Sequence, residues 1–133
     1  MADWDDVRRT AMALPEVTEH VSKAGILQWK VRDRGVVWER PLRRGDLEAL
    51  GDAAPDGPIL GAYVPDLGAK EALIADDPGV YFTTPHFDGY PVVLVELNKI
   101  AADDLDELIG EAWLSRAPKR LAREYLGQGR SER

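Results

Sequence analysis

The chain of 133 residues is 44% hydrophobic, contains no cysteine and carries a formal net charge of −7. This length and composition suit one compact domain with a core of its own, and the lack of cysteine excludes disulfides, thiolate nucleophiles and cysteine-ligated metals. No apolar run approaches the roughly 20 residues of a membrane span, and the acidic N-terminus is unlike a signal peptide, so we expect a cytoplasmic protein without membrane contact.

The first half of the chain predicts one helix followed by three strands. Asp3 suits the N-cap of the helix, and alternating apolar residues predict a half-buried strand with Leu27, Trp29 and Val31 on one side. In chain order, we expect a helix at 3–14, strands at 26–32 and 36–40, an irregular stretch at 41–57 with a short helix starting near Asp46, and a strand at 59–64.

The second half predicts helices alternating with strands. We expect a helix at 65–77 opened by Asp66, strands at 79–84 and 91–97, and helices at 102–117 and 119–126 separated by Pro118. The element order α-β-β-β-α-β-β-α indicates an α+β fold, a two-layer sandwich in which helices cover one face of a mainly antiparallel five-stranded sheet. Residues 1–126 form the single expected domain, and 127–133 a flexible tail.

The segment between the last two expected strands, TPHFDGYP, carries three side chains able to do chemistry: His86, Asp88 and Tyr90. The first interpretation is a purely structural turn, in which Pro85 and Pro91 stiffen the two strand ends and Gly89 takes a positive φ. In such a turn, the side chains of His86 and Tyr90 would form hydrogen bonds with the backbone or with each other. A binding loop is the second interpretation, and acid–base catalysis by His86 the third. The chain shows no catalytic nucleophile in a recognisable motif, no paired histidines for zinc and no cofactor motif, so we assign no catalytic residue, metal or cofactor.

Basic residues concentrate in two places despite the acidic total. Residues 113–133 hold six basic residues and two acids, a net of +4, which leaves −11 on the rest of the chain. The first cluster surrounds the predicted hairpin at 26–40, and the second follows the last predicted helices. The candidate DNA-contacting residues are Lys30, Arg32, Arg34, Arg43 and Arg44 in the first cluster and Arg116, Lys119, Arg120 and Arg123 in the second. A solvated helix face and a charged edge strand are the alternative interpretations.

The segments VYFTTPHFDGYPVVLVEL and AWLSRAPKRL, with ALPEVTEH and ILQWKVR, resemble the MmcQ/YjbR family of small bacterial proteins. The resemblance runs from Val7 to Leu126. It implies a two-layer α/β domain similar to type III secretion chaperones, and the family is customarily labelled DNA-binding through a double-wing arrangement. The positions that match the family motif, without a defined role, are Thr84, Pro85, His86, Gly89, Tyr90 and Pro91, with Pro118, Lys119 and Arg120.

Three functions follow as hypotheses. The first is a non-enzymatic protein that binds double-stranded DNA, with phosphate contacts from both basic clusters. The second is a protein-interaction module, in keeping with the chaperone-like fold, that uses the open sheet face and the loop around Phe87. The third is an acid–base enzyme that uses His86.

Overall fold

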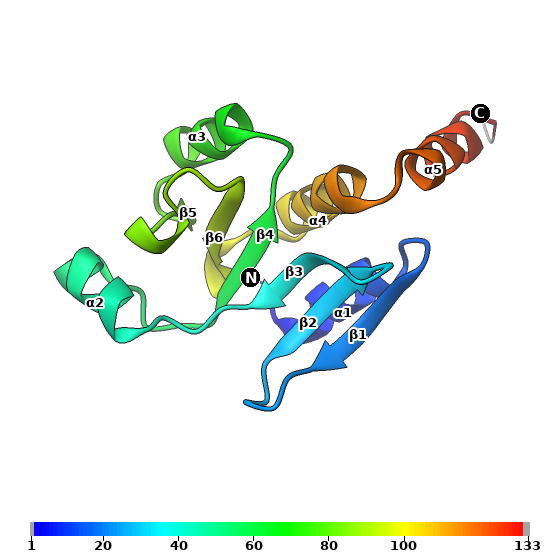
Figure 1. Cartoon of the computed structure of the whole chain (residues 1–133). Helices are drawn as coiled ribbons and strands as arrows, with labels where there is room; N and C mark the ends of the chain where they lie inside the picture. The colour runs from blue at the N-terminus through cyan, green and yellow to red at the C-terminus, as the bar shows by residue number, and fades with distance from the viewer. Residues whose placement is uncertain (1, 132–133) are drawn as a thin grey trace.

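The computed structural model describes residues 2–131, with side chains described up to residue 127, and consists of one antiparallel sheet and its helices (Figure 1). The strands are β1 (Val17–Val21), β2 (Leu27–Val31), β3 (Arg34–Glu39), β4 (Ile59–Tyr63), β5 (Tyr81–Phe82) and β6 (Val92–Glu96), in the order β1-β2-β3-β4-β6-β5. The helices are α1 (Trp4–Met12), α2 (Arg44–Leu50), α3 (Leu67–Asp76), α4 (Ala102–Arg116) and α5 (Lys119–Ser131), with short 3-10 turns η1 (Gly51–Ala53), η2 (Pro85–Phe87) and η3 (Leu97–Lys99). The α+β class and the antiparallel sheet are confirmed.

The sheet has six strands rather than the five expected. The additional strand is β1, which lies at the edge of the sheet and pairs only with β2. Of its five residues only Val17 is buried, so the segment lacks the alternating apolar pattern by which a strand is recognised in a sequence. At the other edge, β5 is two residues long instead of the expected six, because the chain turns into η2 soon after Phe82.

The helix starts follow the expected capping chemistry. The side chain of Asp3 accepts a hydrogen bond from the backbone N–H of Asp6, and the side chain of Asp6 accepts one from the N–H of Asp3, which forms a capping box at α1. Asp66 caps α3 by accepting from the N–H of Ala69 at 2.8 Å. These short-range contacts explain why both helix starts were predictable from local sequence.

The main core lies between the sheet and the helices α1 and α4. Trp29 from β2 and Trp113 from α4 are fully buried there, and Trp29 stacks on Trp4 of α1. Each indole N–H has an acceptor, Glu19 for Trp29 and the carbonyl of Pro15 for Trp113. Helix α3 packs on the same core at the β5 side through Leu73 and Ile74.

Helix α5 continues from α4 after a break at Pro118 and extends away from the sheet (Figure 1). It reaches Ser131, past residue 126 where the sequence placed its end. Leu121 anchors its first turn in the core, and the ring of Tyr125 packs on Trp113 at 5.0 Å. Part of the tail expected at 127–133, residues 132–133, lies outside the described residues.

Candidate binding face on the open side of the sheet

The face of the sheet opposite α1 and α4 carries an aromatic shelf formed by Trp38, Tyr63 and Phe87. The ring of Trp38 lies 5.4 Å from that of Tyr63 and 6.4 Å from that of Phe87, measured between centroids. The strand register explains their common face, since Trp38 pairs with Gly61, two residues before Tyr63. Phe87 is buried, whereas Trp38 and Tyr63 remain partly exposed. The ring of Trp38 thus belongs to a second, smaller hydrophobic cluster, separate from the main core.

A glycine on β4 makes room for this shelf. A Cβ atom at Gly61 would lie 2.7 Å from Cε2 of Trp38, closer than carbon atoms can approach. The indole ring therefore rests directly on the β4 backbone. Two shallow depressions flank this contact and share Trp38 and Tyr63 in their walls. One, of about 240 Å³, also touches Gln28 and Lys30, and the other, of about 270 Å³, also touches His86 and Tyr90.

The motif loop, residues 84–91, closes one side of the shelf. Pro85 begins the turn η2, and Gly89 takes the expected positive φ of 80°. Thr84 is almost fully buried, Tyr90 is 60% exposed, and Pro91 precedes β6 with its carbonyl accepting from the N–H of Val64. The loop is therefore a well-ordered corner that presents selected side chains outward.

A buried lysine holds the motif loop in place. Lys70 on α3 is 6% exposed, and its Nζ donates to the carbonyls of Phe87 at 2.7 Å and Tyr90 at 3.0 Å. Burial lowers the pKa of Lys70, an effect partly offset by the charges of Asp88 and Glu71. Sequence reasoning missed this residue because a single lysine in a helix is ordinarily a solvent-exposed side chain.

A buried ion pair supports the loop from the other side. Nη2 of Arg40 lies 3.0 Å from Oδ2 of Asp46, both side chains are about 5% exposed, and the guanidinium lies 5.2 Å from the centre of the Phe87 ring. Burial raises the pKa of Asp46, but the backbone N–H of Arg43 and the charge of Arg40 outweigh it and hold that pKa below its usual value. The Arg40 side chain thus has a structural role beneath the motif loop.

His86 and Asp88 do not form the pair that catalysis would need. The His86 ring is exposed and makes an edge contact with Phe87 at 4.8 Å. Within residues 2–127, no hydrogen bond joins its ring or the Tyr90 hydroxyl to another group, so the expectation that these side chains form hydrogen bonds is wrong. A general base needs a partner that orients it, and none of the described residues does this for His86.

The cations of the hairpin and of the C-terminal helices meet at one end of this face. Nε of Arg116, the last residue of α4, donates to the carbonyl of Gly35 at 2.9 Å, and its guanidinium lies 4.0 Å above the Tyr63 ring. Burial lowers the pKa of Arg116, with a further lowering by the nearby charge of Arg34 and an opposing effect of Tyr63. One cation of each cluster, Arg34 and Arg116, therefore lies at the contact of Arg116 with Gly35, whose residues are 81 positions apart in the sequence.

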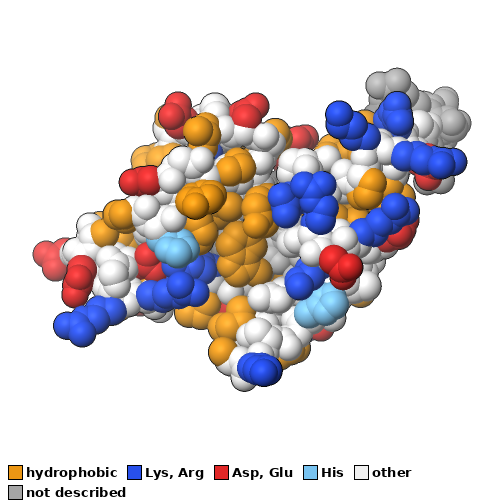
Figure 2. Space-filling view, viewed as in Figure 1, with side chains coloured by type: hydrophobic (Ala, Val, Ile, Leu, Met, Phe, Trp, Pro, Cys, Tyr) orange, Lys and Arg blue, Asp and Glu red, His pale blue; other side chains and the backbone are white. Residues whose placement is uncertain are grey.

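Of the remaining cations predicted to contact DNA, some form ion pairs and others are exposed to solvent. Arg32 forms a two-pronged ion pair with Glu16, with N–O distances of 2.7 and 2.9 Å, while Lys30 lines the depression beside Trp38. On α5, Lys119 and Arg123 are exposed, and Arg120 lies 3.5 Å from Glu124. Arg43 and Arg44 belong to α2, at the opposite end of the molecule. Figure 2 shows these separate groups of basic side chains, with hydrophobic side chains between them.

The class of protein is thus a two-layer α+β domain with one covered and one open sheet face. A model of the YjbR family matches residues 12–115, and the chain therefore belongs to the YjbR family. It is 54% identical over 129 residues to Uncharacterized protein Rv2570 of Mycobacterium tuberculosis and to Uncharacterized protein Mb2600 of Mycobacterium bovis, with 95% of this chain and 97% of each relative covered.

A solved structure supports the same fold. The crystal structure of Deinococcus radiodurans protein DR2400, a DUF419 domain, superposes with a TM-score of 0.65 at 22% identity, covering 86% of this chain and 78% of that one. Across the described residues, no helix is long and apolar enough to cross a membrane. The family, the fold class and the resemblance deduced from the sequence are confirmed.

Proposed function

We propose that this protein is a non-enzymatic, cytoplasmic DNA-binding protein whose contact surface is the cationic end of the open face. The observation that supports the proposal is the meeting of Arg34 on the hairpin with Arg116 at the end of α4, next to the exposed cations of α5. Cations from distant parts of the sequence that share one surface can neutralise several phosphates at once. The aromatic shelf beside them adds partly exposed rings for contacts with sugars or unstacked bases.

The acidic net charge does not oppose this arrangement. Five carboxylates line the cavity between α3 and α4, whereas Arg34 and Arg116 lie at the other side of the sheet and Lys119, Arg120 and Arg123 lie along α5. Repulsion between distant carboxylates and phosphates is screened beyond a Debye length of about 8–10 Å at physiological salt. Duplex DNA can therefore approach the cationic end while the acidic part of the surface faces away.

Fluorescence anisotropy of a labelled duplex, titrated at about 50 and 200 mM salt, tests the proposal. Lys119→Ala/Arg120→Ala should weaken binding equally for all duplex sequences and reduce the salt slope by about one unit per lost phosphate contact. Arg43→Ala/Arg44→Ala removes the same two charges from α2 and should have the smaller effect. Arg9→Ala on α1, a helix that packs against the covered face, should leave affinity unchanged. No binding at the lower salt with micromolar protein would remove the DNA proposal.

A second function, protein recognition, is favoured by the depression beside the motif loop. Tyr90 is 60% exposed next to a hollow of about 270 Å³ lined by Trp38 and Tyr63, and exposed aromatics beside a preformed hollow are typical anchors of protein contacts. If this function holds, Tyr90→Ala should lose partners that wild-type protein retains from nuclease-treated lysate. Loss of every partner on nuclease treatment alone would instead support the nucleic-acid function.

A further inference from the structure

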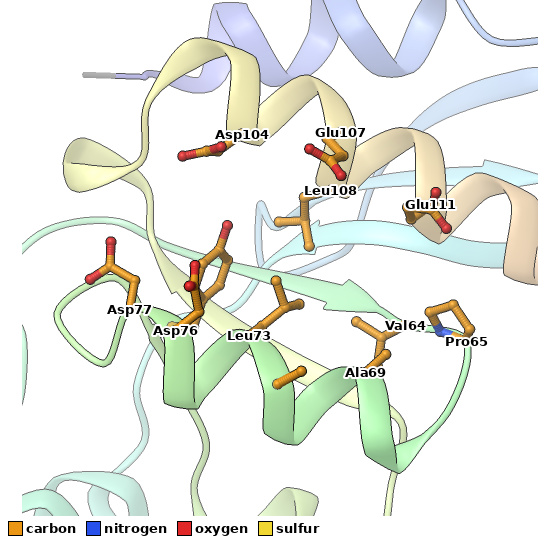
Figure 3. A pocket seen from close by; sticks show the side chains of 12 residues that line it. Val64, Pro65, Ala69, Leu73, Asp76, Asp77, Asp104, Glu107, Leu108 and Glu111 are labelled. Carbon is orange, nitrogen blue, oxygen red and sulfur yellow. The ribbon is translucent and has the colours of Figure 1, made fainter.

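The molecule has a second concave region, on the side of the sheet away from the aromatic shelf. This acidic groove, of about 520 Å³, lies between α3 and α4 (Figure 3). Its apolar floor includes Val64, Leu73 and Leu108, and carboxylates stand along both rims. The rim carboxylates are those of Asp76, Asp77, Asp104, Glu107 and Glu111. A volume of this size lies within the range of small-molecule sites.

These carboxylates have no cationic partners among the described residues. The ion pairs among the side chains of residues 2–127 involve other acids, and no lysine or arginine of this part of the chain lines the groove. Elsewhere acids find partners, as Asp46 does with Arg40 and Glu16 with Arg32. Like charges gathered without compensation destabilise a fold, and a bound cation would relieve their repulsion.

An unpartnered hydroxyl lies in the same groove. Tyr81 on β5 is 6% exposed and lines the groove, yet its hydroxyl has no hydrogen-bond partner among the described residues. Burial raises the pKa of Tyr81 to about 12, and the charges of Asp104, Asp77 and Asp76, which line the same groove, add to the effect. The hydroxyl oxygen is not sealed in the core, so it can accept a hydrogen bond from a ligand in the groove.

We propose that the acidic groove between α3 and α4 binds a small organic cation, an amine or guanidinium carried on a slender apolar body. The apolar floor would take the body, and the carboxylates together with the Tyr81 hydroxyl would accept hydrogen bonds from the charged head. A bare metal ion fits less well, because no three His, Asp or Glu side chains within the described residues are arranged to hold one.

Hexylamine is a suitable probe, with hexanol and hexanoate as matched compounds of the same chain length. In ¹H–¹⁵N spectra of the full chain, hexylamine should shift the amides of α3, α4 and Tyr81 and saturate at millimolar concentration. Hexanol should bind more weakly, and hexanoate should not bind. Shifts by hexanol and hexanoate equal to those by hexylamine would overturn the proposal, since the carboxylates would then have no role.

Substitutions localise the site. Glu107→Gln should weaken hexylamine binding about fivefold, the effect of one exposed ion pair. Asp52→Asn removes one charge far from the groove, in η1, and should leave binding unchanged. Tyr81→Phe keeps the ring and the fold and should weaken the amine more than hexanol. If the Glu107→Gln and Asp52→Asn proteins bind hexylamine with equal affinity, the assignment of the site to the groove is wrong. An absence of hexylamine binding would also overturn the proposal. The same holds if the protein self-associates and Glu107→Gln weakens that association, because a basic segment of a second copy would then be the occupant of the groove.

Discussion

The motif loop and the acidic groove handle charge in opposite ways. Under the motif loop, the buried charges of Lys70, Arg40 and Asp46 all have partners: backbone carbonyls, a carboxylate and an aromatic ring. In the groove, five carboxylates and the Tyr81 hydroxyl have none among the described residues. Paired buried charges specify one local structure, whereas unpaired charges around a cavity leave binding capacity for something outside the chain. The comparison thus separates a region built for stability from one able to accept a ligand.

Removal of the buried carboxylate should have the largest effect. Asp46→Ala leaves the guanidinium of Arg40 buried without its partner and should lower the free energy of unfolding by about 3–5 kcal/mol. Urea denaturation monitored by tryptophan fluorescence measures this. Glu48→Ala, on the same helix, breaks only the exposed pair with Arg44 and should change stability by less than about 1 kcal/mol. Equal losses in the two variants would mean that the buried pair does not support the loop.

Removal of the buried ammonium should have the next largest effect. Lys70→Met keeps most of the side-chain volume but leaves the carbonyls of Phe87 and Tyr90 without their donor, which should cost about 1–3 kcal/mol. Hydrogen exchange should accelerate at the amides of the motif loop and stay unchanged in β1, at the far edge of the sheet. Exchange that accelerates equally throughout the sheet would show that Lys70 acts on global stability rather than on the loop.

The acidic groove should be visible in the alkaline titration of the tyrosines. Absorbance at 295 nm should show Tyr81 ionising with a pKa of about 12. Because the folded chain keeps this proton when the unfolded chain loses it near the usual pKa of 10.0, the corresponding stability is present below pH 10 and lost as the pH rises towards 12. Glu107→Gln should lower the pKa of Tyr81, and Asp52→Asn should not. Ionisation of Tyr81 near the usual pKa of 10.0 would contradict the groove geometry.

The smallest effect on stability is expected for substitution of His86, the histidine in the motif loop. His86→Ala removes an exposed ring that has no hydrogen bond within residues 2–127, so stability should change by less than about 0.5 kcal/mol. The sequence alone led us to expect a larger loss from buried hydrogen bonds. A thermal melt of the His86→Ala protein distinguishes the small loss of stability from the larger one. A fall of several degrees in the melting temperature would mean that the His86 ring forms buried hydrogen bonds.

The sequence by itself determined the elements whose signals are local. Caps such as Asp3 and Asp66, the stripe of α4 from Leu105 to Trp113 and the turn at Gly89 depend on neighbours within a few residues, and all were predictable. The edge strand β1 was not, because a strand with one buried residue lacks a pattern and is stabilised by pairing with β2. The two basic clusters were visible in the sequence, although it did not separate Arg40 as buried from Arg34 as exposed.

Only the tertiary structure decided which distant side chains meet. The contact of Arg116 with Gly35 spans 81 positions, and that of Lys70 with Phe87 and Tyr90 spans 17 and 20. The acidic groove likewise joins carboxylates of α3 with those of α4, each of which reads in the sequence as part of an ordinary solvated helix. Periodicity and capping report interactions within one element, whereas a site depends on how elements pack, which is set by burial summed over the whole core. For this reason the fold and family could be read from the sequence, while the groove and the support of the motif loop could not.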